Sequence, residues 1–504
     1  MTKNIKIMKK LYKISISFLV VFLLVSSCTK DLNLEPISQI SATSYWKTEN
    51  DANGAISGMY ARFRTQSGNM FLWGELRSND FGPSVGGEPV AHGVLYRNTL
   101  NASSSLPTWL GLYTVIHDAN LILKYVPNIK FASETNKNSI LAQALTTRAF
   151  CYFVMARTWG GVPLVDIPTE GSSESNQRER ATIEQIFSFI KKDLDAAITL
   201  FPNNSFPVGR FAWSKPAANA VKADVYLWTG KRMNGGNSDF TTALAALNEV
   251  ETSDVSLLNN FASIFDYTNK GNKEIIFAVR YKDQESGESA PYDQSFLHPQ
   301  SMPNSKDLDP STIAVLSGGR GYSYLQVQPH IRNQFNEKDQ RRDASFKEIY
   351  IYTGGYPAGV KTYYTTIQTK FDGVIISGQR FWYDDYVIYR YGDILLMKAE
   401  AKNALGQDPS TEINKVRQRA YATDFPQFVF VNGTKVQNDA LILKERLLET
   451  AFEGHYWWDL LRFGKAFELV PSLQSQIGKD YLLLFPIEQS TLSIEPKVNQ
   501  NPGY

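Results

Sequence analysis

Apolar residues at helical spacing dominate the first half of the chain. Between residues 108 and 126, Trp109, Leu112, Ile116 and Ala119 follow one another at intervals of three or four, which is typical of a helix with one buried face. The same kind of pattern predicts further helices over residues 44–64, 140–160, 181–201, 214–230 and 239–251. We therefore expect this half of the protein to be mainly helical.

Boundary residues mark the ends of two of these helices. Thr182 and Gln185 have the spacing of a capping box, in which each side chain satisfies a free backbone N–H of the first turn. Ser214 is a good N-cap, and Pro216 suits a first turn because that turn has unpaired N–H groups in any case. Gly230 is expected to end the second helix.

Two segments lack helical periodicity. Residues 65–107 are rich in Gly, Ser, Asn and Pro with scattered aromatics, so they are predicted to be mostly loops. From residue 261 to residue 383, loops alternate with short strand-like stretches at 274–281, 346–354 and 359–370. Helices are predicted to return over 385–407, 408–420 and 439–454.

Two helical stretches are similar to each other. Residues 221–230 and 394–406 are both apolar and Ala-rich, both end at Gly, and both lead toward a second helix. Such helix–turn–helix units resemble degenerate tetratricopeptide repeats, which stack into a scaffold. We predict one mainly α domain from residue 28 to 504, made of an N-terminal helical part (41–260), an irregular part with short strands that faces the ligand (261–383) and a C-terminal helical part (384–504).

The N-terminus has the features of an export signal. A basic stretch around Lys9 and Lys10 precedes a twelve-residue apolar run, Ile14 to Val25, which is too short to span a bilayer. Val25-Ser26-Ser27-Cys28 then resembles a bacterial lipobox, so residues 1–27 are predicted to be a lipoprotein signal peptide and Cys28 the lipidated residue. The alternative is ordinary signal cleavage beside an unrelated Cys.

Composition limits the possible roles of the exported protein. The formal net charge of the chain is +2, and removing the five Lys of residues 1–27 leaves −3, so no basic field favours nucleic acid. Beyond Cys28 the only cysteine is Cys151, in an apolar helical run. We therefore expect no disulfide and a buried Cys151.

Signatures of catalysis and of metal binding are missing from the sequence. It has no GxSxG, HExxH, P-loop or GxGxxG motif, and its five His are far apart. The close acidic pairs Asp384/Asp385 and Asp307/Asp309 resemble glycosidase carboxylates only superficially, because those enzymes usually place their two carboxylates on separate segments. We predict a protein that is not an enzyme, with no cofactor and no metal.

A binding role has more support from the residues of the irregular segments. Aromatic rings can stack on the apolar faces of sugars, and charged groups can bind paired hydroxyls. Loops carried by a rigid scaffold are a common place for recognition. The candidate ligand-binding residues are Trp73, Asp80, Tyr96, Arg97, Arg320, Tyr322 and Tyr324. The alternative for each aromatic is that it packs beneath its own loop.

The densest group of aromatic and charged residues needs a separate interpretation. Residues 453–464, EGHYWWDLLRFG, look like a ligand site, but Trp457, Leu460, Leu461 and Gly464 have the spacing of a buried helix face. Asp459 and Arg462 are expected to pair along the surface of that helix. Upstream, Arg446, Glu449 and Glu453 have the spacing of a polar seam between two helices. We therefore predict that this stretch packs two helices together.

Taken together, the blocks of the sequence resemble the SusD/RagB family of surface lipoproteins from Bacteroidetes. The resemblance extends from the lipobox to QNPGY at the end of the chain, and it includes YWKTENDANGAISGMYARF, RAFCYFVMARTWGGVPLV, VIYRYGDILLMKAEAKNALG and ERLLETAFEGHYWWDLLRFG. Asp80 matches a common acidic position near the family's ligand face. Tyr456 departs from the pattern, because members commonly have Arg there.

The resemblance implies a role at the cell surface. A member of this family is expected to be anchored in the outer membrane by a lipid, here at Cys28, and to bind oligosaccharide without catalysis. It would deliver that glycan to a SusC-like, TonB-dependent transporter. Two alternatives stay open within the same resemblance: a peptide-binding member, and a scaffold that docks the transporter without a soluble ligand of its own.

Overall fold

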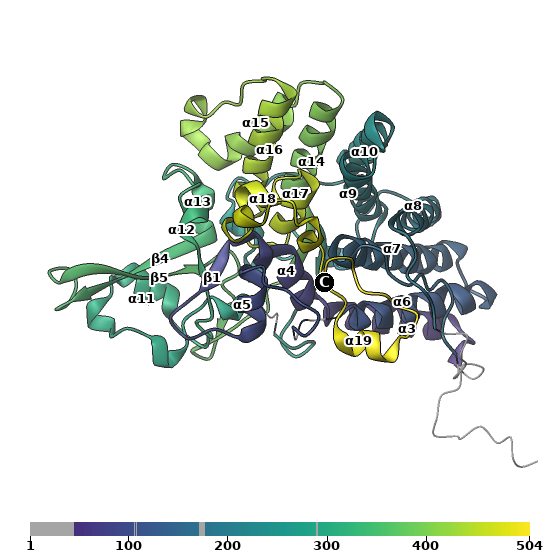
Figure 1. Ribbon diagram of the computed structural model, residues 1–504, viewed down its shortest axis with the longest axis horizontal. Coiled ribbons are helices and arrows are strands. Elements are labelled where there is room, and N and C mark those ends of the chain that lie inside the picture. Colours follow the sequence, from purple (N-terminus) through teal and green to yellow (C-terminus); the bar gives the residue numbers. More distant parts are fainter. Residues whose placement is uncertain (1–44, 105, 107, 171–176, 289–290) are drawn as a thin grey trace, which may run out of the picture.

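Stacked helices form the larger part of the structure, a computed structural model that describes residues 45–504 except 105, 107, 171–176 and 289–290 (Figure 1). The main helices are α3 (Glu49–Arg64), α6 (Leu110–Tyr125), α7 (Glu134–Trp159), α8 (Ile183–Leu200), α9 (Lys215–Arg232), α10 (Gly236–Glu251), α14 (Tyr391–Ala404), α15 (Ser410–Tyr421) and α16 (Lys435–Thr450). Each packs on its neighbours in a continuous series from α3 and α6 to α15 and α16. This arrangement confirms the predicted mainly α fold of helix pairs. The predicted signal peptide and the predicted lipidation site Cys28 lie outside the residues that the structure describes.

The predicted caps are present, with one correction. Thr182 and Gln185 form the capping box of α8, and Ser214 accepts a hydrogen bond from the backbone N–H of Ala217 in α9. Gly230, however, lies inside α9, which continues to Arg232. A Cβ at Gly230 would lie 2.5 Å from the Phe240 ring of α10. The glycine therefore allows two helices to approach closely.

Short antiparallel pairs of strands make up the irregular part. The pairs are β1 (Phe81–Pro83) with β3 (Leu325–Val327), β2 (Ile275–Val279) with β8 (Tyr386–Arg390), β4 (Phe346–Thr353) with β5 (Val360–Gln368), and β6 (Val374–Ile376) with β7 (Gln379–Phe381). The β4–β5 hairpin extends away from the helices on the left of Figure 1. The three predicted strand-like stretches are thus confirmed.

Two sequence predictions about secondary structure were wrong. Residues 385–407 are not one helix, because Tyr386–Arg390 form β8, whose five residues are all buried beside β2. Residues 65–107 contain the helices α4 (Ser67–Glu75) and α5 (Val90–Tyr96). The remaining short helices are α11 (Pro310–Leu316), α12 (Pro329–Arg332), α13 (Gln340–Ser345), α17 (Tyr456–Arg462), α18 (Ala466–Leu469) and α19 (Gln489–Ile494).

The core is centred on α7. Its second half is almost wholly buried, and Cys151 has no exposed surface, which confirms its predicted place in the core. Among the described residues, α7 is the one helix that is long and apolar enough to cross a membrane by length and composition, and 83% of its most apolar window is buried within the protein.

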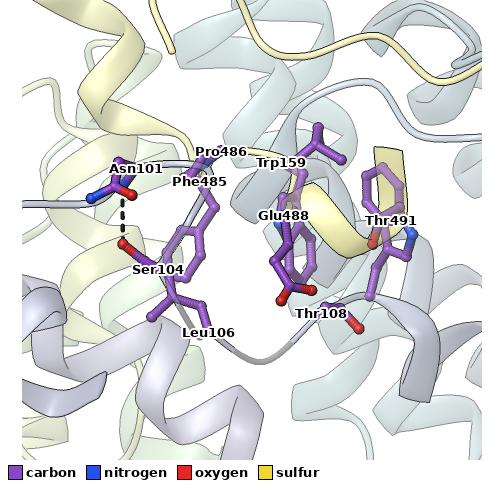
Figure 2. Close-up of a pocket in the computed structure, with 11 residues that line it drawn as sticks. Asn101, Ser104, Leu106, Thr108, Trp159, Phe485, Pro486, Glu488 and Thr491 are labelled. Atoms are coloured by element: carbon purple, nitrogen blue, oxygen red, sulfur yellow. Dashed lines mark hydrogen bonds between the residues drawn. The ribbon is translucent and has the colours of Figure 1, made fainter. Parts of the chain in front are cut away.

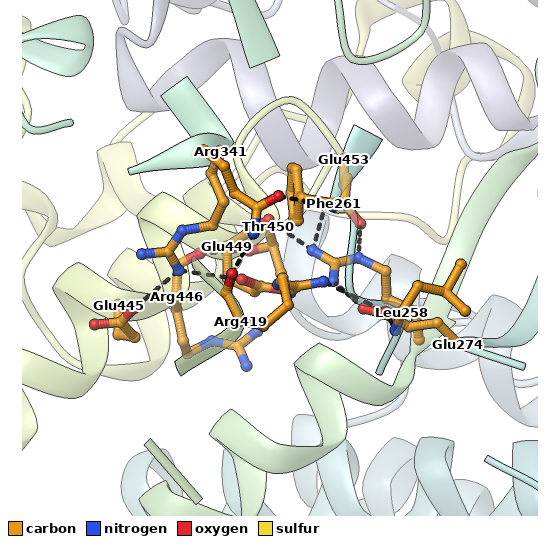
Figure 3. Close-up of polar contacts among 12 residues, drawn as sticks. Leu258, Phe261, Glu274, Arg341, Arg419, Glu445, Arg446, Glu449, Thr450 and Glu453 are labelled. Carbon is orange, nitrogen blue, oxygen red and sulfur yellow. Dashed lines mark hydrogen bonds and ion pairs between the residues drawn. The ribbon is translucent and has the colours of Figure 1, made fainter. Parts of the chain in front are cut away.

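A buried network of ion pairs joins the C-terminal helices to the irregular part (Figure 3). Arg390, at the end of β8, lies 2.6 Å from Glu449 and 2.8 Å from Glu453, both on or just after α16, and 3.0 Å from Glu274. These four side chains are at most 1% exposed. Burial alone would raise the pKa of the Glu453 carboxyl, but the neighbouring Arg390 and Lys370 lower this pKa to about 2. Of the predicted polar seam, Arg446 does join two helices, because it pairs with Asp393 of α14 at 2.7 Å. Glu449 and Glu453 pair instead with Arg390 of β8.

The stretch EGHYWWDLLRFG lies in the scaffold, as predicted. Trp457 on α17 is 1% exposed, and the Arg77 guanidinium lies 4.2 Å from the centre of its ring. The Glu75 carboxylate accepts backbone hydrogen bonds from Phe452 and Gly454, which fixes the turn that precedes α17. One detail needs correction: Asp459 and Arg462 do pair, at 2.9 Å, but both side chains are 2% exposed and lie in the interior rather than on the surface.

Candidate ligand-binding surface

The two irregular segments named from the sequence meet at the β1–β3 pair. Gly82 pairs with Gln326, and beyond the strands the Ser84 N–H donates to the Tyr324 carbonyl at 3.2 Å. The Gly86 N–H likewise donates to the Ser323 carbonyl at 2.9 Å. Residues more than two hundred positions apart are thus held side by side.

A pair of stacked tyrosines is the most exposed aromatic feature at this junction. The rings of Tyr322 and Tyr324 lie 5.3 Å apart with an angle of 18° between their planes. Tyr322 is 46% exposed, so part of its ring is open to solvent. An exposed ring that is already fixed by a stacked neighbour loses little freedom on binding, and it offers a flat apolar surface to a ligand.

Two charged pairs lie on segments connected to these tyrosines, one at α5, whose His92 lies near Tyr324, and one at Arg320, two residues before Tyr322. On α5 and the loop before it, Glu88 binds Arg97 and also accepts a hydrogen bond from the Tyr96 hydroxyl. In the second pair, Arg320 lies 3.0 Å from Glu288, and its guanidinium lies 4.5 Å from the centre of the Phe381 ring. Arg97 and Arg320 are half-exposed. Both guanidinium groups can donate hydrogen bonds to sugar hydroxyls.

Two side chains beside the tyrosines have polar atoms without a partner among the described residues. His92 lies 6.4 Å from Tyr324, ring centre to ring centre, and burial lowers its pKa to about 4, so its imidazole is neutral at pH 7. Its Nδ1 has no hydrogen-bond partner. The backbone carbonyl of Asp293 accepts a hydrogen bond from the Tyr322 N–H at 3.1 Å. The Oδ1 atom of the Asp293 side chain has no hydrogen-bond partner, and burial raises the pKa of this carboxyl to about 7. Sequence reasoning missed both residues because nothing in the local pattern marks them.

Three of the seven candidate residues are buried, which corrects the prediction that they contact the ligand. Trp73 on α4 has no exposed surface and packs edge to face on Trp159 at 5.0 Å, so it is a core residue. Asp80 is also fully buried, and its carboxylate accepts from the Phe81 N–H at 2.9 Å. Tyr96 is 5% exposed and uses its hydroxyl on Glu88. A side chain without exposed surface cannot contact a ligand, which leaves Arg97, Arg320, Tyr322 and Tyr324.

Two cavities that contain aromatic residues lie away from the tyrosine pair. The cavity in Figure 2, between Trp159, Phe485 and Glu488, has about 10 Å³ of open space, enough for about one water. A larger groove, about 540 Å³, runs between α3 and α6. It contains Trp46, whose ring stacks on Tyr125 at 5.3 Å and meets the edge of Tyr45 at 5.0 Å. Because the Trp46 ring already has these two aromatic neighbours, it offers less free surface than Tyr322.

The close acidic pairs of the sequence have structural roles. Asp385 pairs with Lys270 at 2.8 Å, and Asp309 caps α11 by accepting from the Thr312 N–H. Asp384 is 2% exposed, and its Oδ1 accepts from the Gly373 N–H at 3.2 Å. No group of three or more His, Cys, Asp or Glu placed to hold a metal occurs in the part of the chain that the structure describes.

Asp384 gives a test that separates structural from catalytic carboxylates. Burial raises its pKa to about 7, so the folded state holds the proton more tightly than the unfolded state, and the contribution of Asp384 to stability falls as pH rises toward 7. Asp384→Asn should therefore stabilise the protein by roughly 1–3 kcal/mol above pH 8 and have little effect below pH 4. Urea unfolding at both pH values measures this. A destabilised variant at pH 8, or glycan hydrolysis by the wild type that the variant lacks, would contradict it.

Comparison with known proteins gives consistent matches along nearly the whole chain. The protein-family model described as "SusD family" matches residues 360–472 of this chain. A second family model, described as "Starch-binding associating with outer membrane", matches residues 87–227. "SusD-like protein P38" of Formosa agariphila is 28% identical over 99% of this chain and 100% of its own length.

Solved structures agree with the sequence matches. "B. fragilis NanU" is 32% identical, with a TM-score of 0.81 over 94% of this chain and 100% of its own. A SusD superfamily protein from Bacteroides vulgatus is 30% identical, with a TM-score of 0.80 over 91% of this chain and all of its own. A "Laminarin binding SusD-like protein" shares the fold at 24% identity and a TM-score of 0.71, covering 91% of this chain and all of its own. The chain belongs to the SusD family.

Proposed function

We propose that this protein binds oligosaccharide at the cell surface and does not act on it chemically. The observation that carries this proposal is the half-exposed Tyr322, stacked on Tyr324, with the half-exposed Arg320 two residues before it and Arg97 at the end of α5. Such a surface combines a flat ring for the apolar face of a sugar with fixed donors and acceptors for its hydroxyls. The four charges of the two ion pairs that contain Arg97 and Arg320 cancel, which suits a neutral glycan.

The comparisons support the same ligand class. The description of the model that matches residues 87–227 names starch, and a protein of the same fold is described as binding laminarin. Starch and laminarin are both glucans. Linear gluco-oligosaccharides are therefore the first probes to use.

We extend this proposal to the protein's place in the cell. Lipidation at Cys28 would hold the protein at the outer membrane, in agreement with the description of the same model. A single acyl chain binds membranes only marginally, whereas several chains on one Cys would anchor the protein stably. The glycan would then pass to a partner transporter of the SusC type, as the sequence resemblance implies.

Calorimetric titration of the mature protein with α-1,4- and β-1,3-linked gluco-oligosaccharides tests the proposed ligand. Tyr322→Ala should weaken the binding of a tetrasaccharide by roughly three- to tenfold, equivalent to about 0.5–1.5 kcal/mol for one stacked ring. Tyr322→Phe keeps the ring and should retain most of the affinity. The unfolding midpoint of both variants should stay close to that of the wild type, because Tyr322 is half-exposed.

Further variants place the binding surface and separate the alternatives. Tyr356 on the β4–β5 turn is 43% exposed and lies outside the surface, so Tyr356→Ala should leave affinity unchanged. If Trp46→Ala abolishes binding and Tyr322→Ala does not, the glycan occupies the α3–α6 groove and our assignment of the surface is wrong. If no oligosaccharide binds but members of a peptide library do, the proposed ligand class is wrong.

A further inference from the structure

The chain beyond Tyr322 continues the exposed face along a line. From residue 322 to residue 328, burial alternates strictly: Ser323, Leu325 and Val327 are buried, whereas Tyr322, Tyr324, Gln326 and Gln328 are exposed or half-exposed. Successive side chains of an extended segment point to opposite faces, so Tyr324, Gln326 and Gln328 share one face. Ser323 has a positive φ of 55°, and Tyr322 joins this face by stacking on Tyr324. The tyrosine pair is thus one end of a row that continues along β3.

The next tyrosine on this face comes from a different strand. The Tyr363 hydroxyl on β5 donates to the Gln326 Oε1 at 3.0 Å, and the Thr365 hydroxyl donates to the same oxygen at 3.3 Å. Ser84, just beyond β1, lies 3.1 Å from that Thr365 hydroxyl. β1, β3 and β5 therefore lie next to one another, with β1, β5 and β4 visible together in Figure 1. The row of outward side chains on β3 therefore continues onto β5, where Tyr363 contacts Gln326.

Tyr363 is fixed in place and still partly open. Its hydroxyl accepts from the Arg332 Nη1 at 2.7 Å and lies 2.9 Å from the Thr366 hydroxyl. The Arg332 guanidinium lies 4.6 Å from the centre of the Tyr363 ring, and the ring edge meets Tyr350 at 5.9 Å. With these contacts in place, 42% of Tyr363 remains exposed. Three hydrogen bonds to a partly exposed tyrosine position its ring in the same way that stacking positions Tyr322.

We propose that Tyr322, Tyr324, Gln326 and Tyr363 form one linear track that binds an extended oligosaccharide along β3 and onto β5. The inference rests on the proposed function and adds the shape of the ligand and a second aromatic subsite at Tyr363. Tyr322 stacks on Tyr324 at 5.3 Å, and two residues of extended chain, about 7 Å, separate Tyr324 from Gln326, which accepts from the Tyr363 hydroxyl. The track therefore extends beyond a single aromatic ring and fits an oligosaccharide better than a single sugar.

A series of linear gluco-oligosaccharides from two to six units tests the track. For the wild type, affinity should rise roughly tenfold between two and four units, about 1.4 kcal/mol, and then level off. Tyr363→Ala should remove most of this rise and change the dissociation constant of the disaccharide less than twofold. Tyr363→Phe should retain most of the rise, because it keeps the ring and only loses the hydroxyl contacts. Thr362→Ala is the matched control, because Thr362 is the exposed neighbour of Tyr363 on the opposite face of β5.

The outcomes distinguish this inference from the proposed function. If the wild type binds gluco-oligosaccharides and Tyr363→Ala behaves like the wild type at every length, the track is wrong and the proposed function stands. If affinity is the same for two and six units, the track is also wrong. If the wild type binds no oligosaccharide of either linkage, the proposed function fails and the track with it. The unfolding midpoint of each variant shows whether a loss of binding reflects a loss of fold.

Discussion

Arg390→Met should lower the free energy of unfolding by about 3–5 kcal/mol, because it removes the cation that three buried carboxylates share. Arg390 binds Glu449 at 2.6 Å, Glu453 at 2.8 Å and Glu274 at 3.0 Å, and none of the four side chains is more than 1% exposed. Methionine fills similar space but carries no charge. Arg341, Arg419 and Lys370 bind the same carboxylates. The variant therefore leaves this buried group of charges with one positive charge fewer.

Urea unfolding followed by tryptophan fluorescence measures this loss. Arg280→Met is the matched control, because Arg280 and its partner Glu285 are 31% and 47% exposed, and exposed pairs contribute about 0–1 kcal/mol. If the two variants unfold at the same urea concentration, the buried network does not hold the C-terminal helices to β8. We expect Arg390→Met, inside the protein, to lower the free energy of unfolding much more than Arg280→Met does on the surface.

Trp457→Ala should cost about 3–5 kcal/mol of stability, the range for truncating a large buried aromatic. The Trp457 ring is 1% exposed and lies beneath the Arg77 guanidinium, which in turn is 5.3 Å from the centre of the Phe485 ring. Loss of the indole therefore leaves a cavity among α17, the Arg77 segment and the C-terminal segment. Glycan affinity of the fraction that remains folded should be unchanged, because Trp457 belongs to the scaffold.

Paired measurements of unfolding and binding decide the role of Trp457. Trp457→Phe keeps a ring in the site and should cost less than the Ala variant, because it leaves a smaller cavity. A Trp457→Ala protein with the wild-type unfolding midpoint and no glycan binding would contradict the assignment of EGHYWWDLLRFG to the scaffold. Affinity should be measured well below the unfolding midpoint, so that both variants are folded.

Local patterns predicted the features of this protein that depend on nearby residues. Caps at Thr182 and Ser214, the buried face of Trp457 and the core position of Cys151 all follow from spacing within one element. Tyr386–Arg390 was assigned to a helix because an apolar run reads alike in a buried strand and a buried helix. Only its partner β2, about a hundred residues earlier, makes it a strand.

The proposed binding surface was harder to predict because it is assembled from distant segments. Tyr322 and Tyr324 were found from local composition, but Tyr363 joins them only through the contact of β3 with β5. Trp73 and Asp80 were wrongly placed at the ligand. Both residues lie close in sequence to Glu75, whose carboxylate accepts hydrogen bonds from the backbone N–H groups of Phe452 and Gly454. No local pattern shows that this loop-like segment packs against the C-terminal helices. Sequence alone thus named four of the residues at the proposed surface and missed Tyr363.

The most direct test of glycan binding at the tyrosine surface is calorimetric titration of one linear gluco-tetrasaccharide into the wild type, Tyr322→Ala and Trp46→Ala. We expect the wild type and Trp46→Ala to bind alike, and Tyr322→Ala to bind roughly three- to tenfold more weakly with its fold intact. Equal binding by the wild type and Tyr322→Ala would contradict the assignment of this surface.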